Sequence, residues 1–168
     1  MDDYLKRGHM TLIPDGQYEH GYYIPHFGIL KSTGNVAKLR VVFDASAKTA
    51  GGVSLNDKLL VGPKLQADIV RVLLEFRLNQ VCLSTDVKQM FRNILILPEH
   101  RKFQQILWRR APDEPIQEYV LNTVTYGLAP SPFLAIRTLH QLAIEEGSRF
   151  PLAAEALLPN TYVDDILT

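Results

Sequence analysis

The chain has 168 residues, a formal net charge of zero, 46% hydrophobic residues and 21% charged residues. These values are typical of soluble globular proteins, and they exclude a disordered, collagen-like or low-complexity chain. A single cysteine excludes an internal disulfide framework and a cysteine-built zinc site. No apolar run approaches the roughly 20 residues that span a bilayer, and the acidic start is unlike a signal peptide. We therefore expect a cytoplasmic protein without a membrane partner, made of one domain or two small lobes.

The neutral total hides an uneven distribution of charge along the chain. Residues 1–110 contain 16 Lys and Arg against 10 Asp and Glu, whereas residues 111–168 contain 2 against 8. Such segments are usually solvated surface, but the pattern also suits a polyanion bound by one region and metal ions bound by the other. The charge pattern alone does not decide between these two interpretations.

The first predicted elements are a hairpin and a helix. We expect strands over residues 22–30 and 38–43, joined by a turn within the Ser, Thr, Gly and Asn of residues 32–35. Apolar residues at positions 69, 72, 73 and 76 have helical spacing and predict an amphipathic helix after the Gly-Pro pair at 62–63.

The later elements mix short strands with a second helix. Strands are expected over residues 81–87, 94–97, 104–108 and 119–125. Ser131 as N-cap and Pro132 at the first helical position predict a helix that ends before Gly147. Because strands and helices do not alternate strictly, the pattern favours an α+β fold over a doubly wound sheet.

Three aspartates are the strongest candidates for chemistry. Asp164 and Asp165 lie between strand-forming residues, which predicts a hairpin with two carboxylates at its tip, and Asp86 ends the strand predicted at 81–87. Carboxylates gathered in this way favour a bound Mg²⁺ ion, which takes its remaining ligands from water and substrate phosphates. An isolated Asp-Asp pair between strands is usually an ordinary acidic turn, so the order and spacing of other motifs must support the metal site.

Several blocks of sequence, in one order, resemble the reverse transcriptases of long-terminal-repeat retrotransposons, most closely the Bel/Pao group. The blocks are Pro25-His26-Phe27-Gly28-Ile29-Leu30-Lys31, Lys38-Leu39-Arg40-Val41-Val42-Phe43-Asp44-Ala45-Ser46, Ser84-Thr85-Asp86-Val87-Lys88-Gln89-Met90-Phe91, Tyr126-Gly127 with Ser131-Pro132-Phe133, and Tyr162-Val163-Asp164-Asp165. The last block matches the Y-x-D-D box of that family. The resemblance covers residues 22–168.

The resemblance implies an α+β right-hand polymerase fold and RNA-directed DNA synthesis. Asp86, Asp164 and Asp165 would be the catalytic residues, and together with Val87 they would bind two Mg²⁺ ions, with Mn²⁺ as a substitute. Two ions about 3.5–4 Å apart stabilise the attacking and leaving oxygens of a phosphoryl transfer. Asp86 and Asp164 are expected to ligate both ions directly.

The resemblance also implies binding sites for the nucleotide and for the primer and template. The residues expected to bind the deoxynucleoside triphosphate are Lys31, Arg40, Met90, Phe91, Tyr126 and Gly127. Phe91 would block a ribose 2′-hydroxyl, Gly127 would allow a close approach to the backbone, and Tyr126 departs from the glutamine of many retroviral enzymes. Four of these residues also have an ordinary interpretation, as hairpin charge for Lys31 and Arg40, a core aromatic for Phe91 and a turn glycine for Gly127. Primer or template contacts are expected from Asp44, Ser131, Pro132 and Tyr162.

The implied domains are fingers at residues 1–62 and 94–130 and an incomplete palm at residues 63–93 and 131–168. The expected partners are a primed RNA or DNA template, deoxynucleoside triphosphates and the rest of a Pol polyprotein, namely thumb, ribonuclease H and integrase. The expected location is the cytoplasm, including virus-like particles.

Two alternatives remain open at this point. An RNA-synthesising polymerase is disfavoured by Phe91 and Val163, and an inactive or domesticated remnant would only bind nucleic acid. Because three residues follow Asp165, we expect the 168 residues alone to be inactive and poorly stable.

Overall fold

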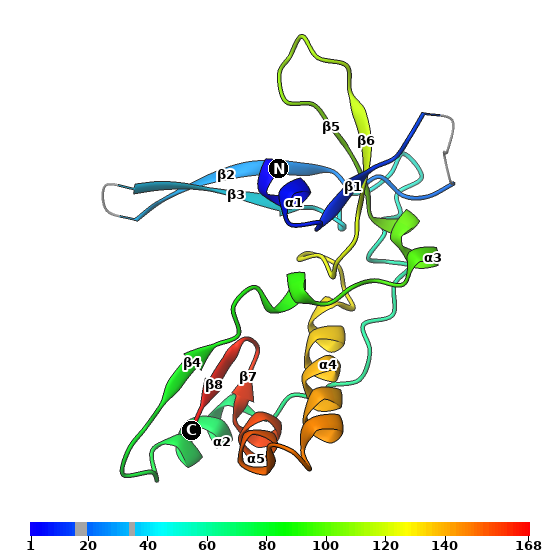
Figure 1. Cartoon of the computed structure of the whole chain (residues 1–168). Coiled ribbons are helices and arrows are strands. Elements are labelled where there is room, and N and C mark those ends of the chain that lie inside the picture. The colour runs from blue at the N-terminus through cyan, green and yellow to red at the C-terminus, as the bar shows by residue number, and fades with distance from the viewer. Residues whose placement is uncertain (16–19, 34–35) are drawn as a thin grey trace. The chain divides into compact units, whose positions relative to one another are not determined.

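The computed structural model describes residues 1–15, 20–33 and 36–168 and divides into two compact units. Unit 1 consists of residues 1–60 and 91–131, and unit 2 consists of residues 61–90 and 132–168. Each unit is formed by two separate stretches of the chain, as the colours of Figure 1 show. The division into fingers and palm proposed from the sequence stays a prediction. Part of the turn expected at 32–35 lies outside the described residues.

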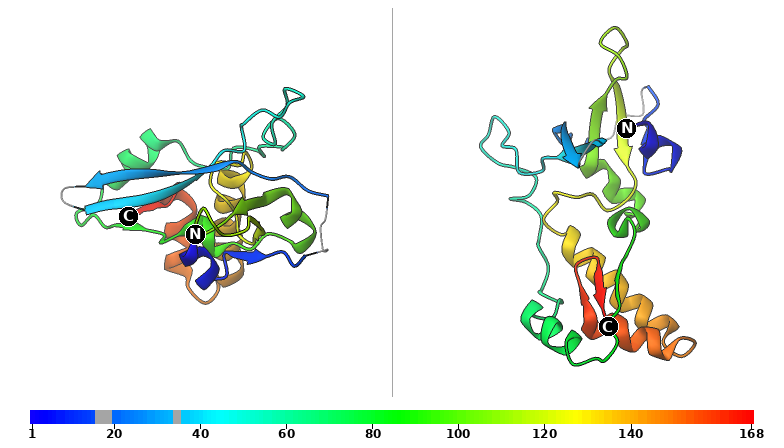
Figure 2. Two further views of the ribbon diagram at one scale, coloured as in Figure 1. Left: turned by 90° about the horizontal axis from the view of Figure 1, so that it is seen from above. Right: turned by 90° about the vertical axis from the view of Figure 1, so that its left-hand side faces the viewer.

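Unit 1 contains two small antiparallel sheets with short helices between their strands. Its elements are α1 (Asp2–Lys6), β1 (Met10–Leu12), β2 (His26–Thr33), β3 (Val36–Phe43), η1 (Met90–Asn93), α3 (Pro98–Arg101), η2 (Lys102–Gln104), β5 (Gln105–Trp108) and β6 (Gln117–Leu121), with Met90 assigned to unit 2. One sheet has the order β1-β6-β5, and β2 and β3 form a two-stranded ribbon that is visible in Figures 1 and 2.

The core of unit 1 lies where the two sheets meet. It contains the buried side chains of Met10, Ile24, Phe43, Ala45, Leu55, Ile106, Tyr119 and Leu121. These residues come from both sheets and from the connecting loops. Burying their apolar surface stabilises the fold by a free energy of about 25 cal/mol for each Å² removed from water. This core anchors the base of the β2–β3 ribbon through Phe43.

Unit 2 combines three helices with a small sheet. Its elements are α2 (Ile69–Phe76), β4 (Ser84–Asp86), α4 (Ser131–Glu146, which begins at the last residue of unit 1), α5 (Pro151–Asn160), β7 (Thr161–Tyr162) and β8 (Asp165–Leu167). The strand order is β4-β8-β7, and α2 and α5 both pack against β7 and β8. Asp68 caps α2, because its carboxylate accepts a hydrogen bond from the backbone N–H of Val70 at 2.8 Å.

The hairpin, the two predicted helices and most of the strands agree with the sequence prediction, and four differences stand out. Residues 94–97 form one isolated bridge, between Leu95 and Thr123. A longer strand has no room here, because η1 ends at Asn93 and α3 begins at Pro98. The strand expected at 81–87 is reduced to β4, whose three residues are exposed. Ser131 is the first residue of α4, and its hydroxyl donates to the carbonyl of Thr125 at 2.6 Å. Helix α5 was not predicted.

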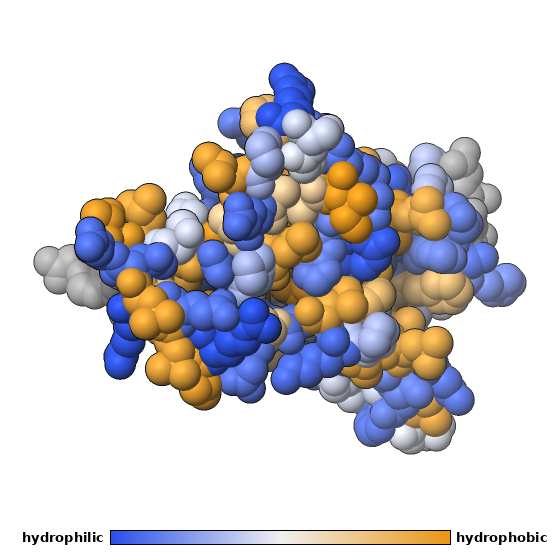
Figure 3. All heavy atoms as spheres, turned by 90° about the horizontal axis from the view of Figure 1, so that it is seen from below, coloured by the Kyte–Doolittle hydropathy of each residue, from blue (hydrophilic) through white to orange (hydrophobic). Residues whose placement is uncertain are grey.

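The three-residue strand β8 is more fully paired than the sequence suggested. It is the central strand of its sheet, pairing along its length with β4 and with both residues of β7. Apolar side chains nevertheless remain exposed in unit 2, among them Leu78, Val81 and Leu152, and Figure 3 shows hydrophobic groups on the face viewed from below. Among the described residues, no helix is long and apolar enough to cross a membrane.

Candidate active site

The small sheet of unit 2 brings the three candidate aspartates to one place. Asp86 in β4 lies directly opposite Asp165 in β8, and Asp165 is also paired with Tyr162 in β7. The backbone N–H of Val87 donates to the carbonyl of Asp164 at 2.7 Å. Two segments almost 80 residues apart in sequence are therefore joined at the position of the aspartates.

The turn between β7 and β8 has an uncommon backbone conformation. Tyr162 and Asp165 close a two-residue loop formed by Val163 and Asp164, and Val163 has φ of +56°. A positive φ at the first loop position is typical of type I′ and II′ hairpin turns, which favour glycine or asparagine there. For a β-branched residue this conformation is strained, and the surrounding strand pairing must hold it.

A second strained turn lies next to the first one. The N–H of Met90 donates to the carbonyl of Val87 at 3.0 Å, and Gln89 within this turn has φ of +54°. Gln89 and Val163 are the two non-glycine residues with positive φ in the described part of the chain. Both turns are linked by the hydrogen bond between Val87 and Asp164. Backbone strain of this kind gathers at functional sites.

The three aspartates are close in the backbone but do not form a closed cluster of carboxylates. Asp86 and Asp165 are exposed, and Asp164 is half-buried. Side chains directly opposite in an antiparallel pair lie on one face with Cβ atoms about 4.5–5.5 Å apart, so two like charges oppose each other here. Within residues 1–15, 20–33 and 36–168, no three His, Cys, Asp or Glu side chains are already gathered to hold a metal ion.

The β2–β3 ribbon of unit 1 places the predicted phosphate-binding residues on one face. The register pairs Ile29 with Arg40 and Lys31 with Lys38, so that Lys31, Lys38 and Arg40 share a face. All three cations are exposed, and in the described part of the chain none forms an ion pair with a carboxylate. Like charges that are directly opposite destabilise a strand pair, which makes this face suitable for a polyanion.

Phe91 and Tyr126 form a ring pair in unit 1. Their centroids are 4.5 Å apart with an interplanar angle of 40°. Phe91 is 7% exposed and Tyr126 is 46% exposed, so the tyrosine presents most of the accessible surface of the pair. The sequence predicts that Phe91 itself contacts the sugar. In the structure Phe91 is buried, so Tyr126 is the more accessible ring of the pair. Met90 is also buried, at 3% exposed.

Gly127 has a structural reason to be glycine. Its φ is +94°, and a Cβ at this position would lie 2.3 Å from the carbonyl oxygen of Phe43. The close neighbour of Gly127 in the structure is thus the backbone of Phe43. Asn56 holds the same turn, because its amide donates to the carbonyl of Gly127 at 2.8 Å and its oxygen accepts from the N–H of Ala129 at 2.8 Å.

The four residues expected to contact primer or template occupy different local settings. The carboxylate of Asp44 accepts from the N–H of Ser46 at 3.1 Å, within the loop after β3. Ser131 is buried and bonded to Thr125, Pro132 is exposed in the first turn of α4, and Tyr162 is half-buried in β7. Ser131 therefore has a structural role in unit 1, and the other contacts stay predictions.

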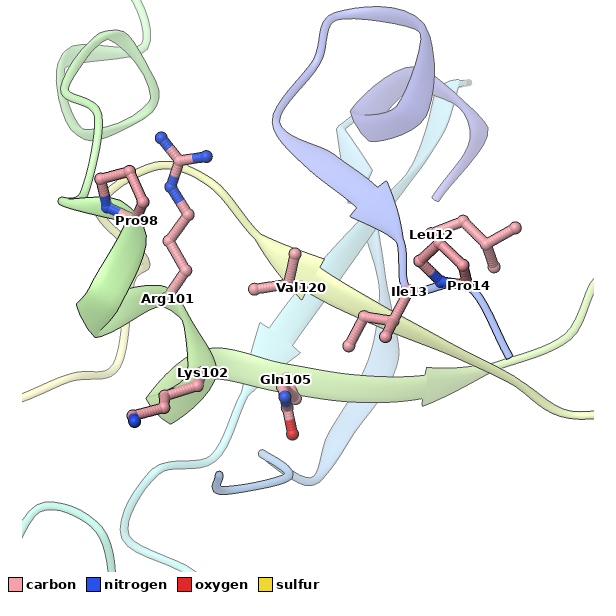
Figure 4. A pocket seen from close by; sticks show the side chains of 8 residues that line it. All are labelled: Leu12, Ile13, Pro14, Pro98, Arg101, Lys102, Gln105 and Val120. Carbon is pink, nitrogen blue, oxygen red and sulfur yellow. The ribbon is translucent and has the colours of Figure 1, made fainter. Parts of the chain in front are cut away.

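A separate pocket in unit 1 contains none of the predicted site residues (Figure 4). Its volume is about 240 Å³. The residues that line it are Leu12, Ile13, Pro14, Pro98, Arg101, Lys102, Gln105 and Val120. Arg101 is already committed to the chain, since its Nε donates to the carbonyl of Ile96 at 2.8 Å.

The sequence analysis did not single out three residues that the structure places beside the candidates. Lys38 faces Lys31, Asn56 holds the Gly127 turn, and Arg92 contacts the residues around Tyr126. For Arg92 a signal was present, because it is a lone charge in the apolar run from Met90 to Leu97. For Asn56 the contact spans 71 residues and has no local signal.

The fold is similar to that of a solved viral enzyme. A crystal structure of the prototype foamy virus protease–reverse transcriptase (CSH mutant, labelled with selenomethionine) matches with a TM-score of 0.67 at 20% sequence identity. The match covers 99% of this chain and 18% of that chain. No family model matches the sequence, and no curated protein matches it. The chain thus has a mixed α+β fold similar to part of a retroviral reverse transcriptase.

Proposed function

We propose that this chain is the fingers and part of the palm of an RNA-directed DNA polymerase from a long-terminal-repeat retrotransposon of the Bel/Pao type. The reaction is attack of a primer 3′-hydroxyl on the α-phosphorus of a deoxynucleoside triphosphate, with release of pyrophosphate. The ordered motifs and the reverse-transcriptase-like fold both support this proposal. Fold similarity alone would not justify an activity, so the local geometry has to support it.

The observation that supports the activity best is the joining of two strained turns beside three aspartates. Val163 and Gln89 both have positive φ, and the hydrogen bond from Val87 to Asp164 links their turns. Asp86 and Asp165 are paired directly next to this bond. A hairpin with only a structural role gains no stability from opposed carboxylates or from a strained backbone. A metal-dependent site requires the carboxylates and tolerates the backbone strain.

The donor set of this site fits Mg²⁺. Carboxylate oxygens are the ligands that Mg²⁺ selects, and it usually takes one or two of them together with water and substrate phosphates. Asp86, Asp164 and Asp165 would hold the ions, with the carbonyl of Val87 as a further oxygen nearby. When bound, two such ions stabilise the charge on the attacking and leaving oxygens. The residues would thus assemble fully only with the nucleotide, in agreement with the open arrangement of the three carboxylates.

The cationic face of the β2–β3 ribbon is the proposed site for the triphosphate. Arg40 offers a planar fork for phosphate oxygens, and Lys31 and Lys38 add two point charges on the same face. A triphosphate would relieve the repulsion between the two opposed lysines. Tyr126, Phe91, Met90 and Gly127 would surround the sugar and base. Asp44, Pro132 and Tyr162 would contact primer and template, and the buried Ser131 would act indirectly.

The remaining partners follow from the same proposal. A primed RNA or DNA template would be the substrate, and the thumb, ribonuclease H and integrase of a Pol polyprotein would complete the protein, within the cytoplasm or virus-like particles. The chain spans 18% of the matched viral protein, so these parts belong to the proposal alone.

A non-catalytic nucleic-acid-binding remnant is the second candidate. It requires no gathered carboxylates, so the open arrangement among the described residues is compatible with this candidate as well. The two candidates differ in what they require of the aspartates, because the remnant needs no metal and the polymerase needs both Asp86 and Asp164.

Mn²⁺ binding and primer extension test the proposal together. We expect the 168-residue chain to bind Mn²⁺ beyond the amount that dTTP alone binds, detected by electron paramagnetic resonance, and Asp86→Asn or Asp164→Asn to abolish this additional binding. In the polymerase translated from the full reading frame, each variant should lower primer extension by roughly a thousandfold or more, because loss of a metal ligand costs several kcal/mol of transition-state stabilisation.

Glu155→Gln is the matched control, since Glu155 is an exposed acid of unit 2 outside the site. It should leave both signals unchanged. Primer extension within tenfold of wild type for Asp86→Asn would refute the metal assignment. Template binding without any extension by the wild-type protein would instead support the remnant.

A further inference from the structure

Arg92 is a buried arginine of unit 1 with no carboxylate partner among the described residues. It is 5% exposed, and its guanidinium donates instead to three hydroxyls. The acceptors are Tyr4 at 3.0 Å and Thr123 and Thr125 at 3.4 Å each. Burial lowers the pKa of Arg92 from its ordinary value, yet an arginine stays charged in proteins. A buried charge without a counterion is costly, so its retention needs a reason.

Aromatic rings take the place of the missing carboxylate. The central carbon of the Arg92 guanidinium lies 4.4 Å from the ring centroid of Tyr4, 5.4 Å from that of Phe43 and 5.5 Å from that of Tyr126. A cation within about 6 Å of an aromatic centroid is attracted to the ring, more strongly when water is excluded. The guanidinium thus holds three rings from three separate segments of unit 1.

Arg92 also joins the two segments that contain the Phe91–Tyr126 ring pair. It follows Phe91 directly in η1, and its Nη1 donates to Thr125, the residue before Tyr126. The ring of Tyr126 therefore contacts two groups. Its centroid lies 4.5 Å from the centroid of the Phe91 ring and 5.5 Å from the central carbon of the Arg92 guanidinium. Because Phe91 is buried and Tyr126 is accessible, the two interior groups support a ring that faces outward.

We infer that Arg92 is a positioning residue that fixes Tyr126 against Phe91, so that Tyr126 forms the wall that meets the nucleotide sugar. Phe91 then acts on sugar choice through Tyr126. This inference rests on the proposed function. Steric rejection of a 2′-hydroxyl requires a wall that cannot yield, because an apolar surface alone discriminates weakly against an added hydroxyl.

Two variants of Arg92 separate position from charge. Arg92→Met keeps the length of the side chain without its charge, and Arg92→Lys keeps the charge without the planar fork. In the 168-residue chain, we expect a strong nuclear Overhauser effect between the Phe91 and Tyr126 rings of the wild type. It should be weak in Arg92→Met and intermediate in Arg92→Lys.

Nucleotide preference supplies a readout that loss of packing elsewhere would not change. Titration of the same chain with dUTP and with UTP, which differ only in the 2′-hydroxyl, gives the ratio of the two affinities. We expect this ratio to fall roughly fivefold in Arg92→Met, the scale of one cation–π contact at a ring that is partly exposed to water. Arg101→Met, which removes a partly buried arginine from the separate pocket of unit 1, should leave the ring contact and the ratio unchanged.

A folded Arg92→Met chain with an unchanged ring contact and an unchanged ratio would overturn the inference. If Arg92→Met does not fold, Arg92→Lys decides in the same way. If the wild-type chain binds neither nucleotide, the proposed function fails, while the ring contact still shows whether Arg92 positions Tyr126.

Discussion

The backbone N–H of Val87 donates to the carbonyl of Asp164 at 2.7 Å, and this bond joins the two halves of the candidate active site. It continues the β4–β8 ladder by one step beyond the pair of Asp86 and Asp165, into the turn that contains Asp164. The position of the aspartates relative to one another is thus set by backbone hydrogen bonds. Side-chain substitutions at these positions should therefore change charge and metal affinity more than they change the fold.

The repulsion between the opposed carboxylates of Asp86 and Asp165 should lower the thermal stability of the chain without metal. We predict that Asp86→Asn raises the Tm of the chain in EDTA, because it removes one of two like charges directly opposite each other, a gain of up to about 1 kcal/mol. Mg²⁺ added together with dTTP should raise the Tm of the wild type above that with dTTP alone and leave the variant unchanged, since binding to the native state stabilises it. Circular dichroism melting measures both effects.

The neutral substitution Glu155→Gln in the same unit should leave the Tm in EDTA unchanged and should keep the response to Mg²⁺. A lower Tm for Asp86→Asn in EDTA would mean that Asp86 stabilises the fold by other contacts.

Strain at Val163 leads to a second prediction. Because Val163 has φ of +56°, Val163→Gly should leave the chain as stable or make it more stable, by about 1 kcal/mol. The matched control is Val70→Gly, which places glycine on the exposed surface of helix α2 and should cost about 0.5–1 kcal/mol. Urea unfolding of the two variants compares them directly. Equal losses in both would show that the Val163 turn is not strained in solution.

The cationic face of the β2–β3 ribbon should bind polyphosphate without any metal. We predict that Arg40→Gln weakens binding of inorganic tripolyphosphate by roughly tenfold, the loss of a bidentate charged contact. The affinity of the wild type should fall steeply between low and physiological salt, because the contacts are exposed. Isothermal titration calorimetry measures both.

The control for this face is Arg109→Gln, which neutralises another exposed arginine of unit 1. It should bind like the wild type. Equal weakening by both substitutions would mean that tripolyphosphate senses net charge and that the ribbon holds no defined site.

Local patterns in the sequence were enough to predict the elements whose residues interact with near neighbours. The β2–β3 pairing, helix α2 and helix α4 all appear close to where alternation, helical spacing and Ser131-Pro132 indicated them. Strand β1 escaped prediction because three residues give no readable alternation, and it is stabilised by pairing with β6 more than 100 residues away.

The aspartates of the candidate site could be predicted from the sequence, whereas the residues that hold the nucleotide-binding residues in place could not. The Asp pair and Asp86 stand in a recognisable order, and antiparallel pairing then brings Asp86 opposite Asp165. The burial of Phe91, the aromatic surroundings of Arg92 and the hold of Asn56 on Gly127 depend on contacts over 30 to 90 residues. No local periodicity encodes such contacts, since they arise only when the core closes.

Gly127 offers a sharp test of the turn beside Tyr126, because Gly8 is a natural control. Both glycines belong to unit 1 and have positive φ, +94° at Gly127 and +71° at Gly8. An added Cβ would meet nothing within 4 Å at Gly8, but at Gly127 it would lie 2.3 Å from the carbonyl oxygen of Phe43. Gly8→Ala should therefore cost only the backbone strain of about 1 kcal/mol.

Gly127→Ala should cost more than about 3 kcal/mol in urea unfolding, because the turn must also move away from Phe43. That movement would stretch the hydrogen bond from Asn56 to the Gly127 carbonyl, so Asn56→Ala should add little to the loss in a double variant. Similar losses for Gly127→Ala and Gly8→Ala would show that the turn has room for a side chain. In that case the requirement for glycine beside Tyr126 would have to come from a bound ligand.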